Sequence, residues 1–510
     1  MPLRKPTSTM STASLLQKSP PAAMSTSVDT SNKTTPASSR DRSQSHSQTS
    51  LSSLGSPSED KPAENLLSPT DPKIIDALNK AFPEEVQRAG QLIDSNGDEF
   101  EIPNFTISDI RAAIPAHCLE RSTSRSLAYV GRDLLYLAVT WLVCHKFITS
   151  EHIPSPFLRG IGWVLYTFLQ GCIGTGLWVL AHECGHGAFS PSKTVNDTLG
   201  FFCHTALLVP YFAWKITHGM HHAHTGHMQK DMVFVPKTRD QYASKLRKLT
   251  HEISELCEET PIVTAVTLIG QQLLGWILYI TTNVTGTDYY TGRKDGRGFG
   301  KKSGFFGGVN HFQPSTPLIN QKDEKLIVYS DLGLAFMAGL FYYVGANFGW
   351  WNLTVWYFIP YLWVNHWLVA ITYLQHTDPS LPHYEDGAWN FQRGAAATID
   401  RDLGLIGTYL MHGIISTHVL HHFVSTIPFY HADEASDAIK PVLGKHYRQK
   451  IGGFWYFVGE MWMAARECQW VEPCPDVEGE GKNVFFYKNR NNRGVPPAKL
   501  PKPEVNPLKY

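Results

Sequence analysis

The 510-residue chain has little charge, and its eight cysteines form no pattern. Only 18% of the residues are charged and the formal net charge is zero, so bulk electrostatics gives no indication of nucleic-acid binding. The cysteines form no CxxC pair and have no regular spacing, and several lie in or beside apolar segments, where cysteine usually acts as a small hydrophobic residue. The simplest interpretation is a reduced, cytosol-facing protein.

Residues 1–70 contain no Phe, Trp or Tyr and are rich in Ser, Thr and Pro. Such a composition cannot build a core, so we expect a disordered tail. The stretch lacks both the apolar core of a secretory signal and the Arg-rich amphipathic pattern of a transit peptide. We expect a cytosolic pre-membrane segment over 71–126, a main domain over 127–474 and a Pro- and Lys-rich tail over 475–510.

Long apolar runs are abundant, in contrast, and indicate an integral membrane protein. Four of them reach the length of about 20 residues that a bilayer requires. The connections 149–156 and 348–352 contain no Lys or Arg, whereas 182–326 contains 15, which places the short turns outside the cytosol and the middle segment inside. The sequence therefore predicts an all-α membrane protein with two transmembrane hairpins and a cytosolic helical cap. The predicted spans are roughly 127–148, 157–181, 327–347 and 353–374.

Many of the 23 histidines gather in three clusters. On a helix, positions i, i+3 and i+4 share one face, so a His-x-x-His-His pentad directs three imidazoles toward one point. Two such pentads are expected by chance on the order of 0.001 times in a chain of this composition. The clusters are His182-Glu-Cys-Gly-His186, His218-Gly-Met-His221-His222 and His418-Val-Leu-His421-His422.

Eight neutral imidazoles predict a site for two transition metals. Imidazole suits iron, zinc, copper and nickel, and a single zinc ion takes only three or four protein ligands. An all-nitrogen shell in an apolar neighbourhood suits a pair of irons that handle O2. One shared site requires all three clusters on the same side of the membrane, and two hairpins satisfy this requirement. We therefore interpret the apolar stretches 199–213 and 262–285 as interfacial or re-entrant helices.

Two other kinds of metal protein fit part of this pattern. The first cluster matches HExxH, with Glu183 as general base, as in a zinc intramembrane protease. A protease would need only one further ligand, which leaves both pentads unexplained. A zinc transporter would place its polar ligands within the spans, whereas these histidines lie beyond the span ends.

The three boxes together resemble those of membrane fatty acid desaturases, in particular the Δ12 (oleate) desaturases of the endoplasmic reticulum. The resemblance covers about residues 105–475 and leaves out the Ser/Thr-rich tail. Further segments that carry it are Ile114-Pro-Ala-His117-Cys118, Leu208–Lys215, Thr225-Gly226 followed by Asp231, Phe234–Pro236, Thr372–Thr377, Leu381–Tyr384 and Ala438–Pro441.

The resemblance implies a di-iron enzyme that uses O2 and two electrons to convert oleoyl chains into linoleoyl chains. The sequence leaves the acyl carrier open between a phospholipid and coenzyme A, and the resemblance favours a phospholipid. It implies two iron ions (Fe2+/Fe3+) and electrons from a separate cytochrome b5 and its NADH-dependent reductase, since the sequence contains no His-Pro-Gly-Gly motif. It also implies the endoplasmic reticulum membrane, with both termini and the metal site in the cytosol. The implied ligands are His182, His186, His218, His221, His222, His376, His418, His421 and His422.

The sequence leaves open both the position at which the acyl chain is modified and the type of product. An omega-3 desaturase or an acyl hydroxylase would use the same apparatus, although Gln375 and Ser416-Thr417 favour Δ12. Among the other histidines, we expect His224 and His227 to be solvated or to support the ligands, and His366 to serve packing. The resemblance also places histidines at positions that could orient ligands by hydrogen bonds, namely His204, His383 and His412.

Overall fold

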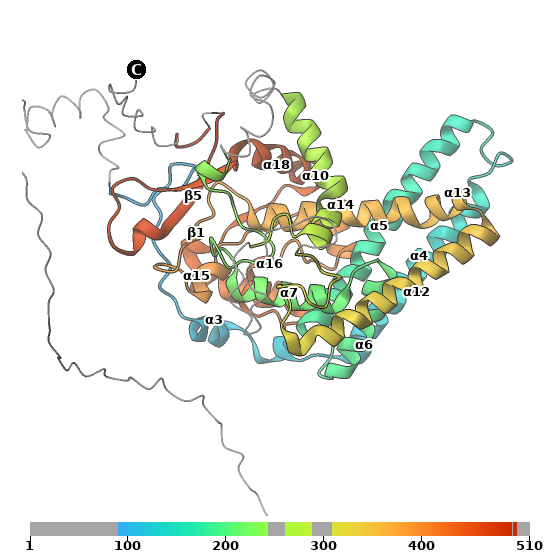
Figure 1. The fold of residues 1–510 in the computed structure, drawn as a ribbon, viewed down its shortest axis with the longest axis horizontal. Coiled ribbons are helices and arrows are strands. Elements are labelled where there is room, and N and C mark those ends of the chain that lie inside the picture. Colours follow the sequence, from blue (N-terminus) through green and yellow to red (C-terminus); the bar gives the residue numbers. More distant parts are fainter. Residues whose placement is uncertain (1–89, 243–260, 288–308, 492, 497–510) are drawn as a thin grey trace, which may run out of the picture. The chain divides into compact units, whose positions relative to one another are not determined.

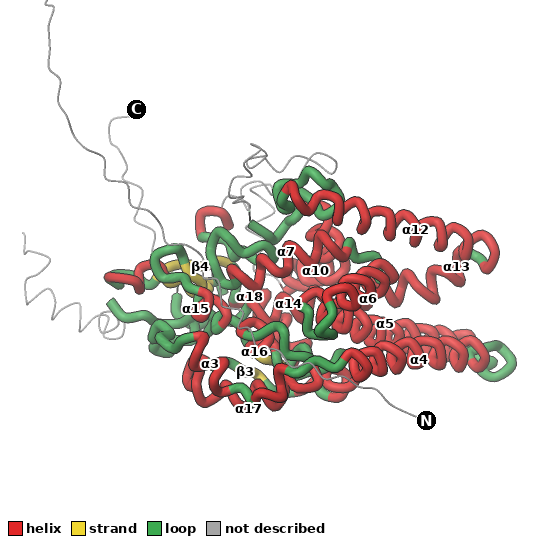
Figure 2. Tube along the Cα trace, turned by 90° about the horizontal axis from the view of Figure 1, so that it is seen from below, coloured by secondary structure: helices red, strands yellow, loops and turns green. Residues whose placement is uncertain are grey.

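The computed structural model of this protein describes residues 90–242, 261–287, 309–491 and 493–496 (Figure 1). The predicted tail over 1–70 lies outside these residues, as do the first part of the segment 71–126 and residues 497–510. Helices make up most of the described chain, as Figure 2 shows, which confirms the predicted helical class.

The first two predicted spans correspond to helices α4 (Thr123–Phe147) and α5 (Pro156–His186). The side chain of Ser155 accepts a backbone N–H at the start of α5, and Pro156 fits its first turn because it needs no N–H partner there. The helix ends at Gly187, whose φ of 74° is in the left-handed region that glycine tolerates. Since α5 continues beyond the predicted end at residue 181, its last turn carries the first histidine cluster.

Helices α6 (Lys193–Ala206) and α7 (Tyr211–His224) follow, and their axes bend by 108° at the break between them. The pair is apolar enough to form either a broken span or a re-entrant loop. The bend is consistent with the expectation that residues 199–213 do not cross the membrane as one straight helix.

Helix α10 (Pro261–Thr282) covers most of residues 262–285, for which the sequence predicts an interfacial or re-entrant helix. Among the described helices, those long and apolar enough to cross a membrane are α4, α5, α10 and the stretch Gln321–Phe348. The polar residues of α10 are too few to distinguish it from a span by composition. Figures 1 and 2 nevertheless show α10 away from the end at which α4 turns into α5, packed instead against α14 and α18, two helices described below.

The third predicted span corresponds to α12 (Glu324–Phe348), and the fourth is built from three pieces. These are α13 (Trp350–Leu353), the π-helical turn η3 (Thr354–Phe358) and α14 (Ile359–His376). Polar residues such as Asn365 lower the mean hydropathy of α14, so it does not join the candidate spans. The helical class is therefore confirmed, whereas the topology of two hairpins with a cytosolic cap stays a prediction.

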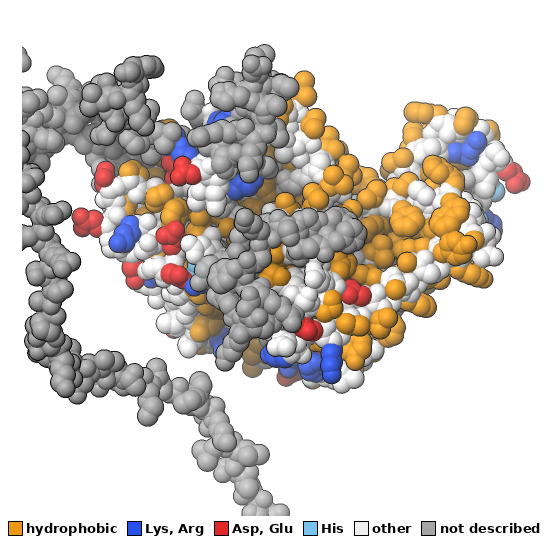
Figure 3. All heavy atoms as spheres, viewed as in Figure 1, with side chains coloured by type: hydrophobic (Ala, Val, Ile, Leu, Met, Phe, Trp, Pro, Cys, Tyr) orange, Lys and Arg blue, Asp and Glu red, His pale blue; other side chains and the backbone are white. Residues whose placement is uncertain are grey.

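Large apolar side chains remain exposed on the helices that carry the predicted spans. Leu135 of α4 is 58% exposed, Phe336 of α12 is 70% exposed and Trp351 of α13 is 74% exposed. Figure 3 shows hydrophobic side chains spread over this part of the surface. Apolar surface of this extent indicates contact with lipid.

The remaining described elements surround the ends of α5, α7 and α14. The short helices of the part before the spans are α3 (Ile107–Ala113) and η1 (Ala116–Leu119), and η2 (Gln321–Asp323) precedes α12. After α14 come α15 (Phe391–Ala395), the π-helical turn η4 (Ile406–Leu410), α16 (His418–Phe423), α17 (Phe429–Leu443), η5 (Gly444–His446), α18 (Gly453–Glu467) and η6 (Gly479–Asn483).

Two small sheets accompany these helices, which the sequence did not predict. The first has the order β1-β5-β4 with antiparallel pairs, and the second pairs β2 with β3 in parallel. In register, His383 lies opposite Phe485 and Trp470 lies opposite Lys488. The strands are β1 (His383–Tyr384), β2 (Asp400–Arg401), β3 (Gln449–Lys450), β4 (Trp470–Pro473) and β5 (Val484–Lys488).

Strand β5 lies within residues 475–510, where the sequence predicts a tail, so the packed domain extends past residue 474. The N-terminal part of the described chain meets this region. The backbone N–H of Val495 donates to the carbonyl of Ser95 at 2.9 Å, and the rings of Phe100 and Phe486 lie 5.2 Å apart. These long-range pairs leave no trace in local periodicity, which explains why the sequence does not indicate them.

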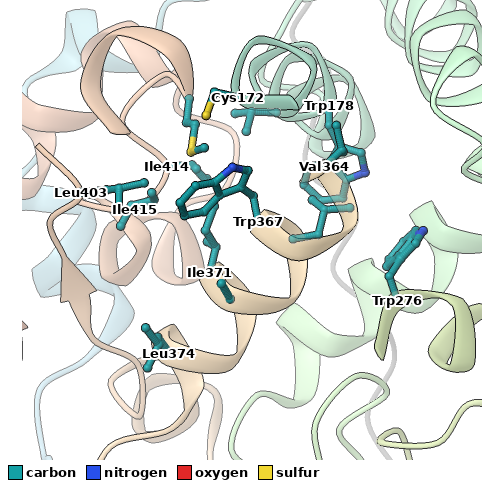
Figure 4. Packing of buried hydrophobic residues seen from close by; sticks show 14 of the residues in the cluster. Cys172, Trp178, Trp276, Val364, Trp367, Ile371, Leu374, Leu403, Ile414 and Ile415 are labelled. Atoms are coloured by element: carbon teal, nitrogen blue, oxygen red, sulfur yellow. The ribbon is translucent and has the colours of Figure 1, made fainter. Parts of the chain in front are cut away.

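The largest core lies between α5, α14 and α10 (Figure 4). Trp367 of α14 is its centre, with Cys172 and Trp178 from α5 and Trp276 from α10 around it. The close approach of α14 to α5 depends on Gly171 of α5, since a Cβ atom at this position would lie 2.2 Å from Cβ of Trp363. Small residues at helix contacts are typical of packing within membranes.

Candidate metal centre

The ends of four helices bring the nine predicted histidines together. His182 and His186 lie in the last turn of α5, and His376 is the last residue of α14. The second pentad lies on α7, and the third forms most of the six-residue helix α16. In both pentads the helical spacing turns the three imidazoles toward one side, as expected.

A first group contains His182, His186, His218, His222 and His421, with one ring nitrogen from each lying within 4.8 Å of the others. The closest contacts converge on Nε2 of His218. This atom lies 3.0 Å from Nε2 of His182 and 3.2 Å from Nε2 of His222. The arrangement can hold one metal ion.

A second group contains His221, His376 and His422, whose nitrogens also lie within 4.8 Å of one another. Nε2 of His376 lies 3.3 Å from Nε2 of His221 and 3.0 Å from Nε2 of His418, which places His418 at the same group. The two groups adjoin, because the rings of His222 and His422 stack with centroids 4.1 Å apart. The geometry is that of two neighbouring metal sites.

The nitrogen separations fit metal coordination better than hydrogen bonding between imidazoles. For metal–nitrogen bonds of about 2.1 Å, two nitrogens on one metal lie about 3.0–3.4 Å apart. Nε2 of His218 cannot satisfy both of its neighbours with a single hydrogen. In addition, Nε2 atoms that are buried without a hydrogen-bond partner among the described residues belong to His186, His421 and His422. Buried polar atoms without a hydrogen-bond partner are rare in folded proteins, so these nitrogens are candidates for binding a metal ion.

Burial keeps the third pentad neutral, as metal ligands must be. Loss of solvation lowers the pKa of His421 to about 3, and the nearby His221 adds to this effect. Burial likewise holds the pKa values of His418 and His422 well below the ordinary value. At neutral pH these imidazoles therefore have a free lone pair for a metal ion.

Asp231 orients the second group, a role that the sequence reasoning missed. Its Oδ1 lies 2.7 Å from Nδ1 of His221 and also accepts the backbone N–H groups of Val233 and Phe234 at 2.9 and 3.1 Å. Burial alone would raise the pKa of Asp231, but His221 and these hydrogen bonds lower it overall. The carboxylate fixes Nδ1 of His221 as the donor and leaves Nε2 for a metal. The available signal was an aspartate ten residues after His221 in a segment otherwise rich in His.

Other side chains hold the helices that carry ligands. Oγ1 of Thr225 lies 3.0 Å from Nδ1 of His422. The buried amide of Gln375 donates to the carbonyl of Ile414 at 3.0 Å, just before α16. Asp400 accepts the N–H of Val419 at 2.8 Å within α16 itself. These contacts fix α16 relative to α14 and α7.

The other histidines lie outside the two groups. Nε2 of His204 lies 3.3 Å from the Trp178 carbonyl, and Nε2 of His412 lies 2.7 Å from Asp133, so neither orients a predicted ligand by a direct hydrogen bond. His383 packs edge-on against Tyr487. Three further histidines that the sequence singled out contact aromatic or acidic neighbours. His224 stacks on Trp389, His227 is buried beside Asp386, and His366 packs against Trp367, as expected for it.

Glu183 does not face the metal groups as an HExxH protease would require. Its Oε2 accepts the backbone N–H of Phe429, the first residue of α17, at 3.1 Å. The carboxylate therefore joins α5 to α17 and is not directed at a water on the metal. Together with the grouping of both pentads around the HExxH histidines, this contact argues against the protease alternative.

Comparison with known proteins identifies relatives over most of the chain. A family model described as fatty acid desaturase matches residues 161–453. A second, described as a domain of unknown function (DUF3474), matches residues 11–140, which include most of the predicted tail, the pre-membrane segment and the start of the first predicted span. An oleate hydroxylase from Claviceps purpurea is 54% identical over 410 residues, covering 80% of this chain and 86% of that protein. A Δ12 fatty acid desaturase from Mortierella isabellina is 42% identical over 396 residues, covering 76% and 92%. A Δ12 fatty acid desaturase from Arabidopsis thaliana is 41% identical over 391 residues, covering 76% and 93%.

Proposed function

Because this chain belongs to the fatty acid desaturase family and is thus an oxidoreductase, we propose that it introduces a cis double bond at Δ12 of oleoyl chains. The product is a linoleoyl chain. The convergence of nine histidines into two adjoining groups carries the proposal, because an unactivated methylene offers no acidic proton and no electrophilic centre to side chains. Only a bound oxidant can attack it.

The proposed cofactors are two iron ions, one in each histidine group. The first group offers His182, His186, His218, His222 and His421, and the second offers His221, His376, His418 and His422. All-imidazole shells suit iron among the transition metals. When bound, the iron pair supplies the chemistry by which O2 and two electrons remove two hydrogens from the acyl chain.

The protein contributes orientation and exclusion of water. Asp231 and Thr225 hold His221 and His422 in fixed ring orientations, so that their Nε2 atoms point inward. Burial of the groups excludes bulk water from the reacting centre. A fixed depth of chain insertion then determines which methylenes lie at the metals, and such orientation is worth many orders of magnitude in rate.

The proposed setting is the endoplasmic reticulum membrane, with the histidine groups and both termini in the cytosol. Electrons would come from cytochrome b5 and NADH–cytochrome b5 reductase, and the substrate would be an oleoyl phospholipid. The scarcity of Lys and Arg in 149–156 and 348–352 supports this orientation. Protease protection in sealed microsomes tests it: cleavage within 190–320 from the cytosolic side is expected, and protection there contradicts it.

Hydroxylation of the same oleoyl chain is the second candidate, and a specific observation favours it. The relative with 54% identity is named an oleate hydroxylase, whereas the Δ12 desaturases reported above are 41–42% identical. The two outcomes differ in whether a second hydrogen leaves the chain or oxygen is inserted. The sequence also leaves an omega-3 desaturase open.

A lipid profile separates these outcomes. The full chain is expressed in a host that makes oleate but no polyunsaturated acids, and fatty acids are identified by mass spectrometry. Linoleate supports the proposal, a hydroxy acid supports the second candidate, and α-linolenate after feeding linoleate indicates an omega-3 enzyme. Absence of any new acid, with the protein inserted, contradicts all three.

Substitution of single histidines tests the metal assignment. Alanine at any of the nine positions should abolish the product, whereas His224→Ala, one residue outside the predicted ligand set on the same helix, should retain it. Purified protein should contain about two irons per chain; zinc without iron would favour the protease alternative. Near-wild-type activity of most of the nine variants would refute the di-iron proposal.

A further inference from the structure

A third group of metal-binding side chains lies away from the nine histidines. His117 and Cys118 come from η1, and His431 and Glu434 come from α17. One potential ligand atom from each lies within 4.8 Å of the other three. The two elements are far apart in sequence, so the tertiary fold alone assembles this group.

We propose that His117, Cys118, His431 and Glu434 bind a zinc ion that fastens the pre-membrane segment to α17. The site is separate from the two histidine groups and does not rest on the proposed function. One thiolate, two imidazoles and one carboxylate are a ligand set that zinc accepts with four-coordinate geometry.

One of the short separations already matches tetrahedral coordination. Zinc bonds of about 2.3 Å to sulfur and 2.05 Å to nitrogen place these two atoms about 3.6 Å apart. Sγ of Cys118 lies 3.6 Å from Nε2 of His117. Nε2 of His117 lies 2.9 Å from Oε2 of Glu434, where zinc would hold them about 3.4 Å apart. No pair is wider than 4.8 Å, so a pair has to close by at most about 1.4 Å. Rotation of the exposed Glu434 side chain and the partly exposed His431 side chain permits this.

Burial differs across the group. Cys118 is completely buried in a core with Ile110, Val419 and Ile439, so its sulfur is fixed. The side chains of His117 and Glu434 are 53% and 55% exposed, which leaves an entry for the ion. Thiolate among the ligands favours zinc over magnesium or calcium, which prefer oxygen.

The ion would act on the region beside the histidine groups. α17 begins at Phe429, whose N–H is held by Glu183 between His182 and His186. The same helix end is tied to the start of α4, because the hydroxyl of Tyr430 accepts the N–H of Ser122 at 2.8 Å and its ring lies 4.0 Å from the guanidinium of Arg125. Zinc would complete this connection by adding His431 and Glu434.

The test compares zinc and iron in full-length protein, purified in detergent after expression with both metals. We expect wild-type protein to hold about one zinc ion more per chain than Glu434→Gln and His431→Gln, with unchanged iron. Loss of a group that only orients a metal ligand weakens metal binding about 10–100-fold. Loss of a ligand itself should therefore weaken zinc binding by at least this factor. Glu120→Gln, which neutralises an exposed neighbouring carboxylate, should keep the zinc.

Cobalt(II) provides a direct signal for the thiolate. Added to zinc-stripped protein, Co2+ should give a thiolate-to-metal absorption band in wild type and in Cys144→Ser, but not in Cys118→Ser. Because Cys118 is buried, its variant could fail to fold. In that case the test uses Glu434→Gln, whose side chain is exposed and which should weaken the same absorption band. Equal zinc in wild type, Glu434→Gln and His431→Gln, or no such band in wild type, overturns the proposal and leaves an ordinary ion pair. Iron content and lipid products report separately on the nine histidines.

Discussion

Nδ1 of His221 lies 2.7 Å from Oδ1 of Asp231, and this contact decides which nitrogen of His221 faces the second histidine group. The carboxylate is buried, since Asp231 is 1% exposed. It is held in turn by the backbone of Gly226, Val233 and Phe234. A short loop after α7 thus controls a ligand on α7 itself.

Asp231→Asn should therefore weaken metal binding in the second group. An amide can still occupy the space but accepts the Nδ1 hydrogen less strongly, and losing such a partner typically costs about 10–100-fold in metal affinity or activity. Iron content and product formation are measured after dialysis against a graded chelator. Asp386→Asn is the matched control, because Asp386 also contacts a histidine, His227, but is 70% exposed. Equal sensitivity of the two variants to chelator would contradict this role.

Gly176→Ala should disrupt the contact between α5 and the π-helical turn η4. A Cβ atom at Gly176 would lie 2.1 Å from the backbone carbonyl oxygen of Leu410, which cannot rotate away as a side chain can. Overpacking of this kind costs about 1–3 kcal/mol. Gly160→Ala, on the same helix with nothing within 4 Å of the added atom, should be neutral or slightly stabilising. Midpoints of thermal unfolding in detergent compare the two variants. Identical midpoints would show that α5 and η4 can move apart to accommodate the added methyl group without loss of stability.

Arg401→Met should destabilise the region just after His376. The buried guanidinium donates to the Leu374 carbonyl at 2.7 Å, to Asp378 at 2.9 Å and to Glu460 at 2.7 Å. Removing one member of a buried ion pair costs about 3–5 kcal/mol, because the remaining charge is left without its partner. Arg111→Met on the exposed surface of α3 should change the free energy of unfolding by no more than about 0.5 kcal/mol. Denaturant titration measures the free energy of unfolding of both variants. The ammonium group of Lys450 also lies 2.8 Å from the carboxylates of Asp378 and Glu460. A small effect of Arg401→Met would mean that Lys450 alone is a sufficient partner for both carboxylates.

The same cluster predicts how stability depends on pH. Burial alone would raise the pKa of Glu460, but hydrogen bonds and charges from Lys450 and Arg401 lower it overall. A carboxyl whose pKa is lowered on folding contributes stability above its unfolded pKa of about 4.3, and loses it as pH falls through the folded value. Wild type should therefore lose more stability than Glu460→Gln as the pH falls from about 5 to about 2. Midpoints of thermal unfolding are measured for both proteins across this pH range. If the midpoints of wild type and Glu460→Gln fall in parallel, Glu460 does not contribute to the pH dependence of stability.

Local spacing carried much of what the sequence could predict. The i, i+3, i+4 pattern of each pentad fixes a common face before any tertiary contact forms, and apolar runs place α4, α5 and α12 within a few residues. The structure brings the nine histidines together, whereas their roles as iron ligands stay predictions. His376 came only from resemblance, because a lone histidine at the end of a helix has no local pattern.

Long-range features could not be predicted in this way. α10 has a composition that suits both an interfacial helix and a span, so hydropathy does not decide between them. Strand β5 pairs over a few residues only, too short a run to distinguish from a tail. The group of Cys118 and Glu434 joins elements more than 300 residues apart, and neither element carries a recognisable metal motif.

Ser95 and Val495 are neighbours in the folded protein, although most of the chain is synthesised between them. A nascent chain can complete its apolar helices early, but β1 and β4 have no strand between them until β5 has left the ribosome. A premature stop codon shortly after residue 475 would therefore yield a polypeptide with every histidine box present and an unfinished sheet. Such a product should be recognised by cellular quality control and degraded, so that even late nonsense alleles behave as null.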